Sequence, residues 1–222
     1  RFGFLLLQPS RIYYQLLGAA LEAAGKGIDQ HEVQTQIVYA DDLSPQTMAA
    51  KLIELGKTCD AVGVLASVHP LMSQAVDALA QRNVPVFALI SQLSATGGTH
   101  YVGIDNWKAG RMFAWTVAHV CKNPGKVGIL VGNHRFRCQE MNESGLRSYF
   151  REHAPEFTLL EPLSTFETSA VAEEMTEKLL ADHPDLCGLI VAGGGISGVM
   201  NALRSSGMAG KVVTVGHHLM EN

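Results

Sequence analysis

The sequence is short of charged residues, and those present do not favour an anionic partner. Only 17% of the 222 residues are charged, and the formal net charge is −4. A nucleic-acid-binding surface needs clustered Lys and Arg to neutralise phosphates, so none is predicted within this chain. Hydrophobic residues make up 47% of the sequence, which excludes a disordered segment and suffices for a sizeable core.

Long apolar runs and patterned cysteines are also missing. No run is long enough to span a bilayer, so we expect no membrane partner. The four cysteines fit no zinc or redox spacing, and we expect buried or free thiols, which favours a reducing, cytoplasmic compartment. We predict no metal and no cofactor. The cysteines are Cys59, Cys121, Cys138 and Cys187.

The sequence lacks a recognisable catalytic set. It has no Gly-x-Ser-x-Gly motif, and nothing places a Cys beside a His. The acidic pair Asp41 and Asp42 is more typical of a helix start than of acid–base chemistry. We therefore predict that the chain is not an enzyme.

What the sequence does have is a regular alternation of short β-rich runs and helical patterns, which predicts mostly parallel sheets with helices on both faces. The expected strands are residues 2–8, 34–39, 61–66, 85–90, 101–104, 126–131, 157–163, 186–192 and 212–216. The expected helices are residues 12–24, 45–57, 70–82, 106–121, 139–153, 170–182, 196–206.

The alternation restarts near residue 101, so we predict two doubly wound α/β lobes, residues 1–104 and 105–222, with a ligand cleft between them. The chain begins at Arg1 rather than Met and stops directly after an expected strand. We therefore expect the natural chain to extend in both directions.

Parallel sheets bind ligands outside the carboxyl ends of their strands, and the first candidate residues follow the first strand. Tyr13 and Tyr14 can stack on the apolar face of a sugar ring, while Ser10 and Arg11 supply polar contacts. In the alternative interpretation, one Tyr packs in the core and the other lies on the surface.

A second candidate group follows the expected strand 126–131. His134, Arg135, Arg137 and Gln139 cluster there, and Arg is a planar fork suited to hydroxyl pairs, carboxylates and phosphates. The spacing does not tell which Arg points inward, and a solvated loop is the alternative.

A third candidate is the run GGGISG, with Gly194 as its second residue. It matches neither a P-loop nor a dinucleotide fingerprint, and we interpret it as a tight turn that gives a ligand close access to the backbone. Ser67 and His69 follow the third strand, and His218 follows the last one. Adjacent His residues on an extended segment point to opposite sides, so His217 and His218 favour hydrogen bonding over metal chelation.

Several stretches resemble the effector-binding domain of LacI-type transcription regulators, which shares its fold with the type 1 periplasmic sugar-binding proteins. The most specific are VGIDNWKAGR, from Val102, and the GLR stretch at Gly145. The resemblance covers essentially the whole chain and implies a type 1 periplasmic-binding-protein-like fold. In the regulators it also implies a homodimer and a helix-turn-helix domain before Arg1 that binds operator DNA.

The resemblance also carries site residues. Tyr13 and Tyr14 fall where the family stacks aromatics on a sugar, and Asn142 falls where many members have an Arg that binds sugar hydroxyls. His218 falls where many members have an Asp, and Ser91 ends a strand where an Asp is common.

Asp105, in the VGIDN stretch, is a further candidate contact, and it can also cap the helix that follows. The Asn-Asp pair usual after the strand 186–192 is replaced by glycines, among them Gly194. The arginines at 135 and 137 would admit an acidic or phosphorylated sugar.

The leading hypothesis is the sugar-sensing domain of a LacI-type regulator, in which ligand closes the lobes and alters operator binding by the dimer. The alternative is a periplasmic sugar-binding receptor of an ABC transporter. A helix-turn-helix before Arg1 would support the first hypothesis, and a signal peptide would support the second.

Overall fold

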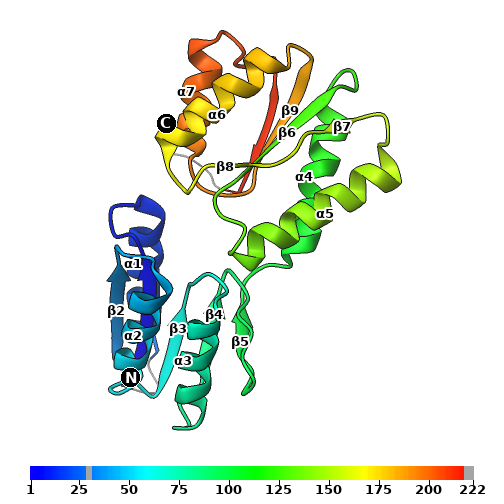
Figure 1. Ribbon diagram of the computed structural model, residues 1–222. Coiled ribbons are helices and arrows are strands. Elements are labelled where there is room, and N and C mark those ends of the chain that lie inside the picture. The colour runs from blue at the N-terminus through cyan, green and yellow to red at the C-terminus, as the bar shows by residue number, and fades with distance from the viewer. Residues whose placement is uncertain (29–31, 218–222) are drawn as a thin grey trace. The chain divides into compact units, whose positions relative to one another are not determined.

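The chain forms two compact units in the computed structural model, which describes residues 1–28 and 32–217 (Figure 1). The first unit contains Arg1–Ile104 together with Arg135–Arg137, and the second contains Asp105–His134 and Cys138–Asn222. Each unit is built on a parallel sheet flanked by helices, which confirms the predicted fold class of two α/β lobes.

The first unit has a sheet in the order β2-β1-β3-β4-β5, with every neighbouring pair parallel. Helix α1 contacts β1 and β2, while α2 and α3 pack against each other. The strands are β1 (Phe2–Leu7), β2 (Thr35–Ala40), β3 (Ala61–Val64), β4 (Val86–Leu89) and β5 (His100–Val102). The helices are α1 (Ile12–Lys26), α2 (Pro45–Leu55) and α3 (Pro70–Ala80).

The second unit repeats this plan with a sheet in the order β10-β9-β6-β7, and β8 also pairs with β6. Its strands are β6 (Lys126–Val131), β7 (Thr158–Leu159), β8 (Leu163–Ser164), β9 (Leu186–Val191) and β10 (Val213–Gly216). Its helices are α4 (Asn106–Val120), α5 (Arg137–His153), α6 (Ser169–Asp182) and α7 (Ile196–Ser205).

The single strand predicted over residues 157–163 is wrong. The structure has two separate two-residue strands there, β7 and β8, each paired with a different part of β6. Pro162 lies between them, and a proline has no N–H to donate to a ladder. The interruption lets β8 rejoin the sheet at the carboxyl end of β6.

Both faces of the second sheet are buried, and the alternation along β6 shows how. Val127, Ile129 and Val131 point into a core shared with α4 and α5, whereas Leu130 points into a core shared with α6 and α7. Figure 1 shows these two helix pairs on opposite faces of the sheet. Successive strand side chains point to opposite faces, so an unbroken apolar strand requires a helix layer on each side. None of the helices in the described ranges is long and apolar enough to cross a membrane.

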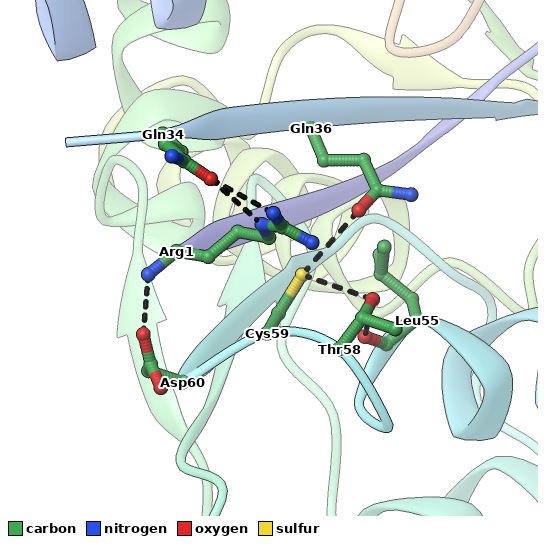
Figure 2. A network of polar contacts seen from close by, with 7 residues as sticks. All are labelled: Arg1, Gln34, Gln36, Leu55, Thr58, Cys59 and Asp60. Carbon is green, nitrogen blue, oxygen red and sulfur yellow. Dashed lines mark hydrogen bonds and ion pairs between the residues drawn. The ribbon is translucent and has the colours of Figure 1, made fainter.

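Polar side chains link the starts of three strands at the amino edge of the first sheet (Figure 2). The Arg1 guanidinium donates to Gln34 Oε1 at 2.8 and 3.1 Å, and the backbone N–H of Asp60 donates to the Arg1 carbonyl oxygen at 2.8 Å. The Cys59 thiol donates to Gln36 Oε1 at 3.8 Å. These contacts lie at the edge opposite the strand carboxyl ends.

Two glycines let α4 and α5 approach each other closely. A Cβ added at Gly145 would collide with the carbonyl oxygen of Trp107, and one added at Gly110 would collide with that of Asn142. In both cases the obstacle is backbone, which cannot rotate away as a side chain can. This contact fixes the start of α5, which carries several candidate site residues.

We expect Gly145→Ala to lower the free energy of unfolding by about 1–3 kcal/mol, the usual cost of overpacking, although Ala is the better helix former. Gly27→Ala is the matched control, because its Cβ would meet no atom closer than 3.6 Å. That control should leave stability unchanged or raise it by up to about 1 kcal/mol. Urea unfolding followed by circular dichroism measures both, and equal effects would contradict the close helix contact.

Candidate functional site

The first unit presents one aromatic ring and buries another at the carboxyl end of β1. Tyr14 is only 9% exposed, whereas Tyr13 is 37% exposed, and the two rings meet edge to face with centroids 5.2 Å apart. Ser10 is exposed, and Arg11 is the extended residue before α1. Tyr13 is therefore the ring available to a ligand, and Tyr14 supports it from the core.

The residues after β3 and β4 are held by backbone contacts. His69 Nδ1 accepts a hydrogen bond from Leu71 N at 3.2 Å and so caps α3, and Ser67 is half-buried beside it in the chain. Ser91 is fully buried. The preceding residue, Ile90, has a left-handed φ of 64°, a rare state for a β-branched residue, and its carbonyl oxygen accepts from Tyr101 Oη at 3.0 Å.

The predicted ligand contacts in the loop after β6 belong to different compact units: His134 to the second, and Arg135 and Arg137 to the first. Arg135 and Arg137 are exposed, and residues 135–137 belong to the first compact unit, where Val68 N donates to the Arg135 carbonyl at 2.8 Å. His134 lies 3.2 Å from Glu143 Oε2 and pairs with that carboxylate.

Gln139 is the centre of a hydrogen-bond network at the carboxyl edge of the second sheet. Its side chain is buried, and Oε1 accepts from Gly132 N at 2.7 Å and from Asn133 N at 3.0 Å. Its Nε2 donates to Glu167 Oε1 at 2.5 Å, and Glu167 Oε2 accepts from Gly194 N at 2.8 Å. The network thus brings together two residues that the sequence predicted, Gln139 and Gly194.

Phe166 and Glu167 lie at the same edge, and the sequence reasoning did not single them out. They follow β8, and both have left-handed backbones, with φ of 48° and 63°. Phe166 is 68% exposed, so its ring is accessible to a ligand. The only available signal was the Pro162 that ends the predicted strand early, because it moves these residues to the carboxyl edge.

The Asn142 side chain is 1% exposed, and its amide nitrogen and amide oxygen differ in their hydrogen bonding. Its Nδ2 lies 2.8 Å from His217 Nε2, and the His217 ring meets Phe113 edge to face at 4.7 Å. Its Oδ1 is buried without a hydrogen-bond partner among the described residues. The predicted contact His218 lies outside the described residues.

Asp105 acts as a helix cap in this structure. Its Oδ1 accepts from Lys108 N at 3.0 Å, and its Oδ2 lies 3.5 Å from Lys108 Nζ. Both carboxylate oxygens therefore have partners within the first turn of α4.

The Cys121 thiol is held in its neutral, less reactive form. Burial raises the pKa of the Cys121 thiol to about 12, with the neighbouring Cys187 adding to the rise, so this thiol stays protonated at neutral pH. None of the four cysteines forms a disulfide. Over residues 1–28 and 32–217, no three His, Cys, Asp or Glu side chains lie close enough to hold a metal ion.

Known structures share the fold of this chain. A solute-binding protein of an ABC transporter from Actinobacillus succinogenes, with bound D-allose, is 22% identical with a TM-score of 0.83, covering 97% of this chain and 76% of that one. The glucose-galactose binding protein GanP from Geobacillus stearothermophilus is 18% identical with a TM-score of 0.84, covering 99% and 78%.

A carbohydrate transporter solute-binding protein from Agrobacterium radiobacter, in complex with D-arabinose, is 17% identical with a TM-score of 0.85, covering 97% of this chain and 75% of that one. No curated protein sequence matches the chain. The family model described as a periplasmic binding protein domain matches residues 2–222. The chain therefore belongs to the periplasmic binding protein family.

Proposed function

We propose that this chain binds a monosaccharide and serves as the sugar-binding receptor of an ABC transporter. The structural relatives described above bind D-allose, glucose or galactose, and D-arabinose, and two are named as transporter solute-binding proteins. Such a receptor works outside the cytoplasm and has no catalytic step, so we expect no turnover of the bound sugar.

The observation that carries the proposal is an exposed aromatic ring at the carboxyl edge of each sheet. Tyr13 in the first unit and Phe166 in the second are accessible rings that suit the apolar faces of a pyranose or furanose. Asn142 Oδ1 is buried with no hydrogen-bond partner among the described residues, and in this proposal it accepts a hydrogen bond from a sugar hydroxyl. A neutral sugar matches these groups better than an acid does.

A second candidate function is the effector-binding domain of a LacI-type regulator in the cytoplasm. The observation that favours it is that none of the four cysteines forms a disulfide, since disulfides are the usual state of paired thiols in oxidising compartments. Fractionation of cells that express the natural full-length chain separates the two functions. A periplasmic chain excludes the regulator, and a cytoplasmic chain that binds operator DNA excludes the receptor.

We expect Tyr13→Ala and Phe166→Ala each to weaken sugar binding about tenfold or more, since an aromatic stacking contact contributes about 0.5–1.5 kcal/mol beyond the area it buries. Calorimetric titration with D-allose, D-tagatose, D-galactose, D-glucose and D-arabinose measures the affinities. The control is Trp115→Ala, which removes a half-exposed ring on α4 that stacks on His119.

That control should bind as the unmodified protein does. Unchanged affinity in both edge variants would refute the stacking role of these rings. A panel extended to a uronic acid and a hexose phosphate tests the preference for neutral sugars, because binding of only the anionic members would assign the contacts to Arg135 and Arg137 instead.

Replacing Asn142 should separate binding from stability. Asn142→Leu removes a buried acceptor that has no partner, which offsets the lost bond to His217, so we expect stability to change by less than about 1 kcal/mol. Sugar affinity should fall about threefold to tenfold, the loss expected for one hydrogen bond. Asn201→Leu, on the exposed side of α7, is the control. A variant that loses stability but keeps its affinity would remove Asn142 from the site.

A further inference from the structure

Three separate loops of the second unit are tied together by two side chains. The loops follow β6, β8 and β9, and they contain Gly132, Glu167 and Gly194 in turn. Gln139 holds the first loop through two backbone N–H groups and passes a hydrogen bond to Glu167, which holds the third loop. We call Gln139 and Glu167 the edge brace.

The loops meet too closely for any residue with a Cβ at two positions. A Cβ at Gly132 would collide with the Glu167 carboxylate, and one at Gly193 would collide with the backbone of Gly132. Thr165 adds a further tie, since its hydroxyl donates to the Gly194 carbonyl at 2.9 Å. Gly194 is thus held at both its N–H and its C=O.

The brace also explains the backbone after β8. Two consecutive non-glycine residues in the left-handed region are unfavourable, and they persist only where the surroundings hold them. Both carboxylate oxygens of Glu167 accept hydrogen bonds, from Gln139 and from Gly194. These bonds fix Glu167, and they thereby fix the neighbouring Phe166, whose ring stays in solvent.

Gln139 has little left to offer a ligand directly. Its Oε1 already accepts two hydrogen bonds, and its Nε2 already donates one. We propose that Gln139 and Glu167 are positioning residues for sugar binding, which act by holding Phe166 and the Gly194 loop in the binding geometry. This inference rests on the proposed function, and it replaces the predicted direct contact of Gln139 with an indirect role.

The direction of each hydrogen bond makes the brace testable by exchange of the two side chains. With Glu167→Gln, the amide that replaces the carboxylate can satisfy Gly194 N only by turning its own NH₂ group toward the NH₂ of Gln139. With Gln139→Glu, two carboxylates face each other. In the double variant, Gln139→Glu with Glu167→Gln, the new carboxylate at 139 accepts hydrogen bonds from Gly132 N, from Asn133 N and from the new amide NH₂ at 167. The oxygen of that amide still accepts from Gly194 N.

The experiment measures the affinity of each variant for the monosaccharide that binds the unmodified protein best in the panel above. We expect each single variant to bind at least tenfold more weakly and the double variant to recover to within about threefold. Glu177→Gln, which removes an exposed carboxylate from α6, should have no effect. If Gln139 contacts the sugar directly, the double variant stays weak, and this result overturns the proposal, as does normal binding by both single variants.

Hydrogen exchange of the backbone amides tests the brace without a ligand. The amides of Gly132, Asn133 and Gly194 should exchange at least tenfold faster in each single variant and at the original rate in the double variant. This readout separates two failures. If the unmodified protein binds no sugar of the panel but the exchange pattern holds, the proposed function fails and the brace stands as a structural element only. Unchanged exchange in the single variants refutes the brace itself.

Discussion

In both units the paired strands run parallel, so the chain must cross back over the sheet before it can pair again. This single constraint has two effects. Crossovers cover both faces of each sheet, which is why the strands are almost wholly apolar, and all strand carboxyl ends gather at one edge. The loops that begin there come from distant parts of the sequence, and they are the places where polar groups converge.

The fold was predictable because apolar periodicity and turn residues are local signals. The bounds of β6 and the start of α1 follow directly from the pattern around Lys126 and Ile12. The strand expected over residues 157–163 was wrong because the apolar pattern there continued through Pro162, and the missing N–H of that proline outweighed it. Periodicity detects burial, but it does not detect the loss of one ladder hydrogen bond.

The candidate site was less predictable, because its contacts depend on side-chain pairing across loops. The sequence singled out Gln139 and Gly194, but it gave no sign that Glu167 would link them. The two tyrosines looked equivalent in the sequence, and only the packing of α1 distinguishes the buried Tyr14 from the accessible Tyr13. The sequence allowed Asp105 to be either a ligand contact or a helix cap, and the structure shows it as the cap of α4.

The left-handed pair Phe166 and Glu167 has a consequence for how tightly a ligand can bind. Ordering a flexible loop consumes part of the free energy of association, on the order of 1 kcal/mol for each side chain that must be immobilised. A loop that is already ordered in the free protein has lost this conformational entropy during folding, so it loses little more when a ligand binds. Binding energy at this edge can therefore go into affinity and selectivity, and the protein bears the cost as lower intrinsic stability.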